Sequence, residues 1–404
     1  MTMAADKQDK VLNVPTLRFP EFSGDWKEST IGKEFELYSG NTPSRLDKEN
    51  FVGDVNWITS GELKDHYIGE TKEKISENSA KENNLRLLPE GTFVIAIYGL
   101  EAEGVRSTGS IITKQSTISQ ACMAFTPKGI ISNEFLYSWY KKHGNVIGIR
   151  YAQGTKQQNL SYDIIEKFKI RYPSLQEQDK LNSFISLLDT RISTQSRIIN
   201  ELQSLISGIT QRTSKHSSVR MVLLSELLVE RNEKNTELFP VHSVSVSEGV
   251  INQIDYLGRS FSAADTSHYN VAHRGDIIYT KSPTGEFPFG IVKRNSVETK
   301  VSVSPLYGVY KPVSDEVALY IHYYFCSPLN AQNYLHKLIQ KGAKNTINIT
   351  NQRFLENIIP LPDRKTLTGF VKLISAVSAK LELEKSLLET LQTQKRYLLT
   401  QMFV

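Results

Sequence analysis

The stretch that decides the fold is Leu181–Ile209, which reads LNSFISLLDTRISTQSRIINELQSLISGI. Its apolar residues recur at alternating steps of four and three, a spacing that places them along one side of a helix. These apolar positions are Leu181, Ile185, Leu188, Ile192, Ile199, Leu202, Ile206 and Ile209. The pattern predicts a long helix from about Gln176 to Gln211 with an apolar seam on one side.

The same seam returns 189 residues later, in Phe370–Leu398, which reads FVKLISAVSAKLELEKSLLETLQTQKRYL. Seven of the eight corresponding positions are apolar, and the exception is Lys395. The one polar position inside the first seam, Gln195, corresponds to Glu384. Because the seam, its register and its polar position recur together, we interpret the two segments as an internal repeat.

The repeat extends to the segments before the helices. Gly154–Gln158 corresponds to Gly342–Thr346, and Lys169–Pro173 corresponds to Ile358–Pro362. Each unit is therefore predicted to have a strand that ends at proline before its long helix, since the residue before a proline avoids helix. Weaker correspondences link Gly91–Ile95 with Gly275–Tyr279, Ser119–Pro127 with Ser304–Pro312, and a helix at Phe135–Tyr140 with one around Leu319–Phe325.

The composition sets the broad class of the protein. The 404 residues suffice for two domains of ordinary size, and the net charge of +5 permits a nucleic-acid partner without demanding one. The two cysteines, Cys122 and Cys326, form no Cys-x-x-Cys pair, so neither a disulfide framework nor a zinc module is predicted. No stretch is apolar enough to span a membrane, and no signal peptide is recognisable. We expect a cytoplasmic protein.

These observations predict an α+β fold with five segments. Residues 1–16 are expected to form a disordered leader, 17–173 a first globular domain, 174–212 a first spacer helix, 213–362 a second globular domain, and 363–404 a second spacer helix. A helix of about 36 residues spans roughly 54 Å. An antiparallel helix pair keeps the termini of the second domain close together, as domain termini usually are. We therefore expect two pseudo-twofold-related α/β domains joined by a pair of long antiparallel coiled-coil helices.

No catalytic or metal-binding residues are predicted. The sequence contains no glycine-rich phosphate loop, no His-Glu-x-x-His and no Asp/Asn-Pro-Pro-aromatic tetrapeptide. Asp54, Glu62 and Lys64 have the carboxylate and lysine order of many metal-dependent nucleases, and such groups can hold Mg²⁺. However, this combination is common in a charged chain, and the second unit has no counterpart. A surface strand and turn is the favoured interpretation.

Two similar modules on rigid helices suit a protein that binds two separated sites on one DNA duplex. Lysine suits phosphate contacts, and the amides of glutamine and asparagine can bond adenine in a bidentate manner. Residues of these kinds recur at corresponding positions of the two units. The candidate DNA contacts are Lys156, Gln157, Gln158, Tyr98, Arg106 and Lys114 in the first unit, and Lys344, Asn345, Tyr279, Lys281, Lys293 and Arg294 in the second.

The order of globular unit, strand with proline and long helix, all repeated once, resembles the specificity subunit of Type I restriction–modification enzymes. The resemblance is strongest in Gly154–Ile209, with Pro173–Gln178 before its helix, and in Gly342–Phe403. Leu17–Pro20, and Gly61–Leu63 after Trp57, also resemble the first target-recognition domain of that family. Asp363-Arg364-Lys365 departs from the Glu-Gln pair of the family at the start of the second helix.

The resemblance implies a subunit without catalysis or cofactors of its own. Each target-recognition domain would read one half of a split double-stranded DNA target, and the coiled coil would set the gap. Two modification subunits would dock on it and methylate adenine N6 with S-adenosylmethionine. Restriction subunits that use ATP and Mg²⁺ would translocate and cut unmodified DNA. The alternatives are a self-contained nuclease or methyltransferase, and a scaffold with two binding modules that do not bind DNA.

Overall fold

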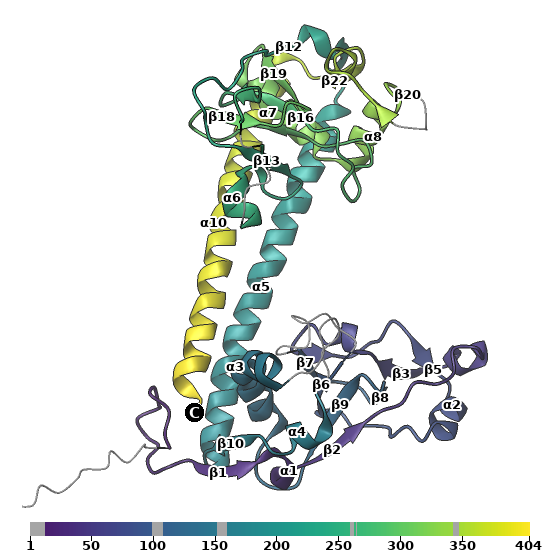
Figure 1. Ribbon diagram of the computed structural model, residues 1–404, viewed down its shortest axis with the longest axis vertical. Coiled ribbons are helices and arrows are strands. Elements are labelled where there is room, and N and C mark those ends of the chain that lie inside the picture. The colour runs from purple at the N-terminus through teal and green to yellow at the C-terminus, as the bar shows by residue number, and fades with distance from the viewer. Residues whose placement is uncertain (1–12, 99–107, 152–159, 259–261, 264, 342–346) are drawn as a thin grey trace, which may run out of the picture. The chain divides into compact units, whose positions relative to one another are not determined.

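The computed structural model describes residues 13–98, 108–151, 160–258, 262–263, 265–341 and 347–404 (Figure 1). The chain divides into two compact units. Unit 1 comprises Met1–Gln195 and Leu387–Val404, and unit 2 comprises Ser196–Ser386. The division falls inside both long helices, so each unit contains one segment of each helix and one globular part.

The globular part of unit 1 is built on a five-stranded sheet with the strand order β2-β9-β6-β7-β4. Its strands are β2 (Phe35–Ser39), β9 (Cys122–Pro127), β6 (Phe93–Ala96), β7 (Gly109–Ile112) and β4 (Tyr67–Ile68). The first four strands pair antiparallel, whereas β4 is parallel to β7. The smaller elements are β5 (Lys74–Ile75), β3 (Val55–Ile58) and β8 (Ser116–Ile118), which form a second sheet, and α1 (Ile31–Glu34), α2 (Glu77–Glu82) and α4 (Tyr162–Ile165).

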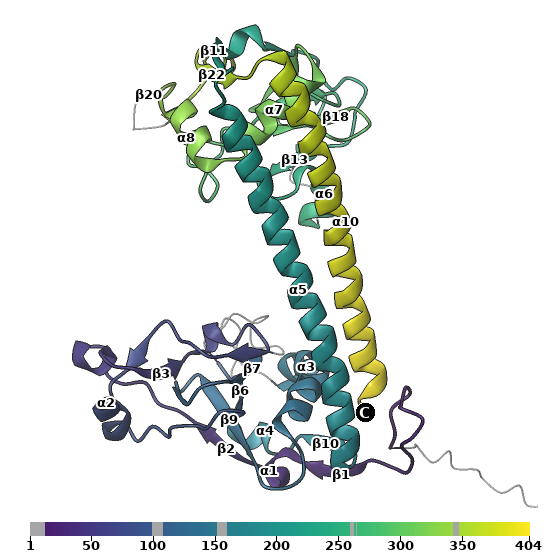
Figure 2. The same cartoon turned by 180° about the vertical axis from the view of Figure 1, so that it is seen from behind.

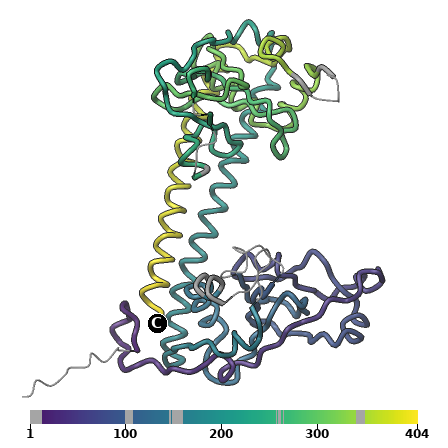
Figure 3. Tube along the Cα trace, in the orientation of Figure 1, coloured from purple at the N-terminus to yellow at the C-terminus, as the bar shows by residue number. Residues whose placement is uncertain are grey.

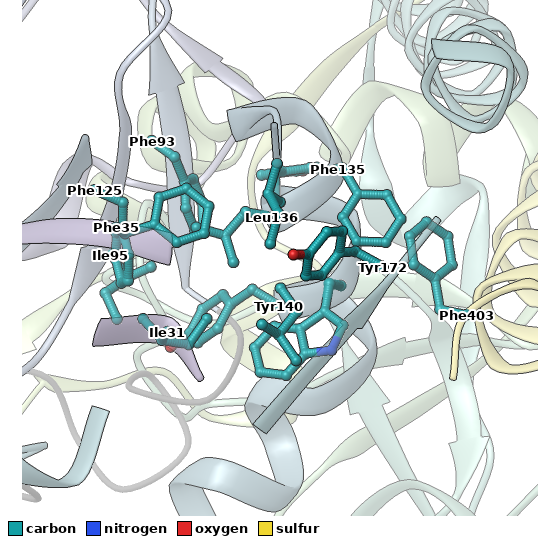
Figure 4. Close-up of a cluster of buried hydrophobic side chains, with 14 of the residues drawn as sticks. Ile31, Phe35, Phe93, Ile95, Phe125, Phe135, Leu136, Tyr140, Tyr172 and Phe403 are labelled. Atoms are coloured by element: carbon teal, nitrogen blue, oxygen red, sulfur yellow. The ribbon is translucent and has the colours of Figure 1, made fainter. Parts of the chain in front are cut away.

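Helix α3 (Asn133–Tyr151) connects this sheet to the long helices (Figure 1). Its Phe135, Leu136, Trp139 and Tyr140 lie at helical spacing and are all buried. The ring of Tyr140 packs on Phe93 of the sheet, and the ring of Phe135 packs on Phe403 at the end of the chain (Figure 4). The main core of unit 1 therefore includes residues of the sheet, α3 and the long helices.

Unit 2 has a four-stranded antiparallel sheet with the order β12-β19-β16-β17. Its strands are β12 (Leu228–Glu230), β19 (Gly308–Pro312), β16 (Ile277–Tyr279) and β17 (Val292–Arg294). Two-stranded sheets pair β13 (His242–Ser245) with β14 (Gly249–Asn252), β15 (Asn270–Ala272) with β18 (Val301–Val303), and β20 (Gln340–Lys341) with β21 (Ile347–Asn348). Its helices are α6 (Gln253–Leu257), α7 (Asp315–Phe325), α8 (Pro328–His336) and α9 (Asn351–Phe354).

The topology confirms the internal repeat. The order β2-β9-β6-β7 of unit 1 corresponds to β12-β19-β16-β17 of unit 2. In both units a glycine with positive φ, Gly91 at 83° and Gly275 at 90°, precedes the central strand, a conformation that glycine adopts without steric cost. The strand before each long helix also repeats, because β10 (Lys169–Tyr172) pairs with β1 (Lys27–Thr30) as β22 (Ile358–Leu361) pairs with β11 (Arg220–Leu223). Strand β4 is the exception, and no described strand of unit 2 takes its place at the edge of β17.

The two predicted long helices are present as α5 (Leu175–Ser214) and α10 (Arg364–Met402). Each starts two residues after a proline, and a capping side chain precedes it. The Ser174 hydroxyl accepts a hydrogen bond from the Glu177 backbone N–H, and the Asp363 carboxylate accepts one from that of Thr366. Asp363, where the sequence departs from the family pattern, therefore serves as a helix N-cap.

The long helices are antiparallel in both units. In unit 1, Leu399 and Met402, near the end of α10, share a core with Leu181 near the start of α5 (Figure 2). In unit 2, Phe370 and Ile374 near the start of α10 share a core with Ile209 near the end of α5. The predicted direction of the helix pair is thus confirmed.

The prediction that residues 1–16 form a disordered leader is wrong for residues 13–16, and residues 1–12 lie outside the described residues. The Asn13 carbonyl accepts a hydrogen bond of 2.8 Å from the Trp26 backbone N–H, and Pro15 is buried. The Leu17 backbone N–H donates to the Gln401 carbonyl at 2.9 Å, so this segment is held beside the last turn of α10 (Figure 3). Residues 13–16 are therefore part of the ordered structure of unit 1.

Two of the sequence signatures meet at the start of α5. Arg18, in Leu17–Pro20, forms hydrogen bonds of 2.8 and 2.7 Å to the two carboxylate oxygens of buried Glu177. Gln178 is also buried, and its side chain accepts from the Ser132 N–H and donates to the Pro173 carbonyl. The Glu-Gln pair that resembles the family therefore has a structural role, because it fixes α5 to the globular part.

Candidate nucleic-acid interface

Half of the predicted DNA contacts lie outside the described residues. These are Arg106, Lys156, Gln157 and Gln158 of unit 1 and Lys344 and Asn345 of unit 2. The described residues on either side of these segments nevertheless have defined places in the fold.

In unit 1, the residues that flank two of these segments are neighbours. The Leu160 N–H donates a hydrogen bond of 2.8 Å to the Ile97 carbonyl. Ile97 directly follows β6, and the next residue, Tyr98, is half-buried against the main core of unit 1. Tyr98 and Leu160 therefore lie near each other, beyond the end of the central strand.

Unit 2 repeats this arrangement around Lys281, which lies two residues beyond the end of β16 as Tyr98 lies two residues beyond β6. Burial lowers the pKa of the Lys281 ammonium, while the nearby Glu230 carboxylate opposes this effect. Glu230 accepts a hydrogen bond of 2.7 Å from the side chain of Asn351, the first residue of α9. Lys281 is therefore close to α9 (Asn351–Phe354).

Two of the predicted DNA contacts are core residues, and their assignment is corrected. Tyr279 is only 1% exposed, its ring stacks on Phe354, and its hydroxyl donates to the Phe289 carbonyl at 2.8 Å. Lys293 is 6% exposed, and its Nζ lies 3.4 Å from the Cys326 Sγ. Neither side chain is available to a duplex on the surface, because all three residues of β16 are buried and Lys293 on β17 packs beside Cys326.

The other two described candidates are ion-paired. The Lys114 ammonium pairs with Glu70 and is exposed, so it keeps access to a phosphate. The Arg294 guanidinium pairs with Asp315 and is largely buried. Lys114 thus remains a candidate contact in the described part of unit 1, whereas Arg294 lines an open cavity of unit 2.

The nuclease-like residues Asp54, Glu62 and Lys64 do not form a metal site. One Glu62 carboxylate oxygen accepts hydrogen bonds from the backbone and hydroxyl of Thr59, both at 2.9 Å. The other oxygen accepts from the Lys72 backbone N–H at 2.7 Å. In the described ranges, no group of three His, Cys, Asp or Glu side chains is arranged to hold a metal ion. Glu62 is a capping residue, in agreement with the favoured interpretation as a surface turn.

A charged cluster in unit 1 was not predicted from the sequence. The His66 imidazole lies 2.9 Å from a Glu134 oxygen and 3.2 Å from an Asp189 oxygen, and Asp189 also pairs with Lys395. The ring of His66 is stacked between those of Tyr67 and Tyr137, with centroids 4.1 and 3.9 Å away. The cluster joins β4, α3, α5 and α10, and the one signal in the sequence was Lys395 at an apolar seam position.

Burial and charge act in opposite directions in this cluster. Burial by itself lowers the pKa of His66, but hydrogen bonds from the ring to Asp189 and Glu134 raise that pKa above its ordinary value. Burial would raise the pKa of Asp189, and His66 and Lys395 lower it. Burial and the nearby Lys395 lower the pKa of Lys141 to about 8. The cluster therefore favours an imidazolium between two carboxylates.

The helices that the structure describes include none with the length and apolar character needed to cross a membrane.

Comparisons with known proteins agree with the predicted resemblance. Residues 23–204 match the profile of the Type I restriction modification DNA specificity domain. The Type I restriction enzyme MjaIX specificity subunit of Methanocaldococcus jannaschii is 28% identical over 177 residues, which are 43% of this chain and 40% of that protein. The matched part thus spans about two-fifths of the length of this curated relative.

Solved structures match over nearly the whole chain. The S subunit of the Type I restriction–modification system from M. genitalium has a TM-score of 0.58 at 14% identity, with 97% of this chain and 99% of that chain covered. A chain from work on complex assembly and conformational transition of the type I R-M system has a TM-score of 0.53 at 13% identity, with 93% and 96% covered. At such identities the likeness shows the fold. The chain is therefore similar to Type I specificity subunits in sequence over most of unit 1 and in fold throughout.

Proposed function

We propose that this chain is the DNA-specificity subunit of a Type I restriction–modification complex and that each unit reads one half of a split target. The observation that carries the proposal is the repeated sheet order in one chain, together with the match of residues 23–204 to a DNA specificity domain. A repeat of one DNA-reading module suits a target with two separated halves. The same observation does not favour a self-contained nuclease or a scaffold protein that does not bind DNA.

The recognition loops of each unit are proposed to lie beyond the end of the central strand, β6 or β16. Tyr98 and Lys281 occupy this place among the described residues. Lys156 and Lys344 would contact phosphates, while Gln157, Gln158 and Asn345 offer amides that can bond adenine edges. Arg106 and Lys114 would add further phosphate contacts in unit 1.

The chemistry is assigned to partner subunits. Two modification subunits that use S-adenosylmethionine would methylate adenine, and restriction subunits that use ATP and Mg²⁺ would cut unmodified DNA. Exposed side chains outside the helix seams offer docking surface for the modification subunits. Leu187 on α5 and Leu383 on α10 are large exposed apolar residues, and Lys372 and Glu389 are exposed charges elsewhere on α10.

The lengths of α5 and α10 are proposed to set the gap between the half-sites. One heptad inserted after Gln195 and another after Glu384 would add about 10.5 Å, or roughly three base pairs, which turn the groove by about 100°. Binding should then weaken at every gap. Three heptads in each helix add about 31 Å, near one turn of DNA, and should restore binding to targets whose gap is about nine base pairs longer. If the chain with three added heptads in each helix still bound targets with the original gap, the helices would not set the gap between the half-sites.

The function is tested by mapping methylated adenines in cells that express the modification subunits with and without this chain. We expect a two-part motif only when the chain is present. The purified chain should neither methylate nor cut DNA when S-adenosylmethionine, ATP and Mg²⁺ are supplied. Cleavage by the chain alone that disappears in Lys64→Ala would support the nuclease alternative instead.

Lys281 allows a matched test of the interface. The variant Lys281→Ala should bind target DNA more weakly, and the slope of log affinity against log salt should fall by about one. Lys311→Ala is the control. Lys311 lies on β19 next to Tyr310, which pairs with Ile277 at the start of β16, whereas Lys281 lies just beyond the end of β16. Equal effects of the two variants would show that the interface lies elsewhere on unit 2.

A further inference from the structure

In the described part of unit 2, no strand pairs with the outer edge of β17, and a side chain takes its place. In unit 1, the N–H of Ile111 on β7 donates to the His66 carbonyl next to β4. The corresponding residue of unit 2 is Arg294 on β17, and its N–H donates instead to the His322 Nδ1 at 3.1 Å. A side chain of α7 therefore satisfies the edge of the sheet where unit 1 uses a strand.

A cavity of about 670 Å³ lies at this edge, inside unit 2. Its walls come from β17, α7, the loop between β13 and β14, and the segments of α5 and α10 that belong to this unit. Cys326 follows α7 and is half-buried in this wall, and Tyr323 on α7 forms a hydrogen bond of 2.6 Å with Ser378 on α10. A small molecule that enters the cavity would therefore meet the thiol close to the long helix.

Two hydrogen-bond donors point at this thiol. The Lys293 Nζ lies 3.4 Å from the Cys326 Sγ, and the His322 Nε2 lies 3.7 Å from it. Because the His322 Nδ1 accepts the Arg294 N–H, the proton of the neutral ring is on Nε2, the nitrogen that faces the sulfur. The hydrogen bond from the Arg294 N–H thus fixes the tautomer of His322 that presents an N–H to Cys326.

This arrangement favours the thiolate. Burial by itself raises the pKa of Cys326, but His322 and Lys293 lower that pKa to about 6. The other charged groups of the cavity are Arg294, Glu248, Glu382 and Lys385. The Lys385 ammonium donates to the Glu382 carboxylate at 2.8 Å, and the Arg294 guanidinium pairs with Asp315. Each of these ion pairs is neutral, so the Lys293 ammonium and the neutral His322 Nε2–H are the donors that face the sulfur anion.

We propose that Cys326 is a nucleophilic modification site, at which hydrogen peroxide or another small electrophile that enters the unit 2 cavity forms a covalent bond to sulfur. With peroxide, the thiolate attacks one oxygen, an S–O bond forms, and the O–O bond breaks. Sulfur is oxidised by two electrons to a sulfenic acid, and the leaving hydroxide takes a proton from solvent to give water. With iodoacetamide as a probe, the thiolate displaces iodide and forms a thioether.

Cys122 is an internal control in the same chain. It is fully buried in unit 1, where its sulfur lies 3.7 Å from the Ser119 hydroxyl oxygen and 3.7 Å from the Ile58 carbonyl oxygen. Burial raises the pKa of this thiol to about 12. The two cysteines of the full chain should therefore differ in reactivity, although they share one solution and one reagent concentration.

The test measures the alkylation rate of each cysteine in the folded full-length chain from pH 5 to pH 10, by mass analysis of the two peptides. The rate at Cys326 should rise with a midpoint near pH 6 and level off by about pH 7.5. Cys122 should remain unlabelled until the chain is unfolded. A midpoint at Cys326 near the ordinary value of about 8.5, or no labelling of Cys326 in the folded chain, would overturn the proposal.

Variants and a second reagent make the test specific. Lys293→Met keeps the buried stem and removes the ammonium, so the midpoint at Cys326 should move to higher pH, whereas exposed Lys311→Met should leave it in place. Peroxide at neutral pH should give a dimedone-trapped product on Cys326 and none in Cys326→Ser. Equal midpoints in Lys293→Met and the unmodified chain would overturn the role of Lys293, and absence of the peroxide product would overturn the site.

Discussion

At the scale of single residues, the two units differ most where the globular part meets the long helices. Unit 1 has Tyr137 and Lys141 on α3 and Asp189 on α5 at this junction, whereas unit 2 has His322 on α7, Cys326 directly after α7 and Ser378 on α10. Unit 1 builds a charged cluster there around His66, and unit 2 builds a cavity with a thiol. The repeat therefore preserves the backbone while the polar chemistry at this junction has diverged.

The His66 cluster predicts a pH-dependent stability. A histidine whose pKa is raised in the folded state stabilises the fold fully below its unfolded pKa of about 6.5, and this stabilisation is lost as pH rises through the raised value. The difference in unfolding free energy between the unmodified chain and His66→Asn should therefore be largest at pH 5.5–6.5, at about 1–3 kcal/mol, and shrink towards pH 8.5. Urea unfolding at several pH values measures this difference.

Exposed His268 provides the control for this prediction. The variant His268→Asn should change stability little and by the same amount at every pH. If the unmodified chain and His66→Asn kept a constant difference from pH 5.5 to 8.5, the imidazolium would not contribute to the stability of the cluster.

The sequence predicted the apolar seam positions of the helices but not which side chains contact one another in the fold. Lys395 interrupts the second apolar seam, but the seam pattern could not identify its partner Asp189. Nor could it identify His66, which also contacts Asp189, because His66 lies far away in the sequence, next to β4. Tyr279 and Lys293 were assigned to the surface because their types suit DNA. Both are buried, because β16 is covered on both faces and Lys293 packs beside Cys326, and the sequence did not reveal these tertiary contacts.

At the scale of elements, the heptad seams were fully predictable. Every seam position of α5 and α10 is buried or half-buried, and the recurrent polar pair, Gln195 and Glu384, is buried as well. The helix ends also followed from local signals, since proline and a capping residue precede both helices. Strand β4 was not predictable, because two residues carry no periodicity and only pairing with β7 makes them a strand.

Two neighbouring residues of α5 test the seam. Ile185 is 1% exposed and lies in the core of unit 1, whereas Leu187 is 70% exposed. Ile185→Ala should lower the free energy of unfolding by about 2–4 kcal/mol, because it removes buried methyl groups and leaves a cavity. Leu187→Ala should change it by less than about 0.5 kcal/mol. Chemical denaturation of both variants provides the comparison.

Leu187→Ala also separates stability from assembly. If modification subunits dock on the exposed helix faces, this variant should weaken their binding in a pull-down while the chain keeps its unfolding midpoint. Equal losses of stability in the two variants would contradict the seam, and unchanged assembly in Leu187→Ala would exclude this residue from the docking surface.

At the scale of the whole molecule, the two compact units do not coincide with the two halves of the sequence repeat. The sequence suggested globular domains separated by spacer helices, but contacts assign Leu387–Val404 to unit 1. Phe403 explains this assignment, because it packs on Phe135 and Trp26 of unit 1. Such long-range packing is set by tertiary contacts, which local periodicity does not encode.

This packing specifies how one recognition unit can be exchanged for another. An exchange of residues 27–172 leaves Arg18 and Trp26 in place to hold Glu177 and Phe403. The donor segment must supply residues equivalent to Phe135, which packs on Phe403, and to His66, which pairs with Asp189. With these contacts kept, the chimaera should fold with the stability of the original chain and change one half of the methylated motif.

The reciprocal exchange of residues 220–361 is the matched control. It should change the other half of the motif and leave the first half as it was, because each globular part contains its own sheet and its own loops beyond β6 or β16. Methylation maps of the two chimaeras give the answer directly. If either exchange altered both halves of the motif, recognition of one half-site would depend on residues of both units. The repeat would then reflect how the fold arose and would not correspond to a division of the DNA target between the units.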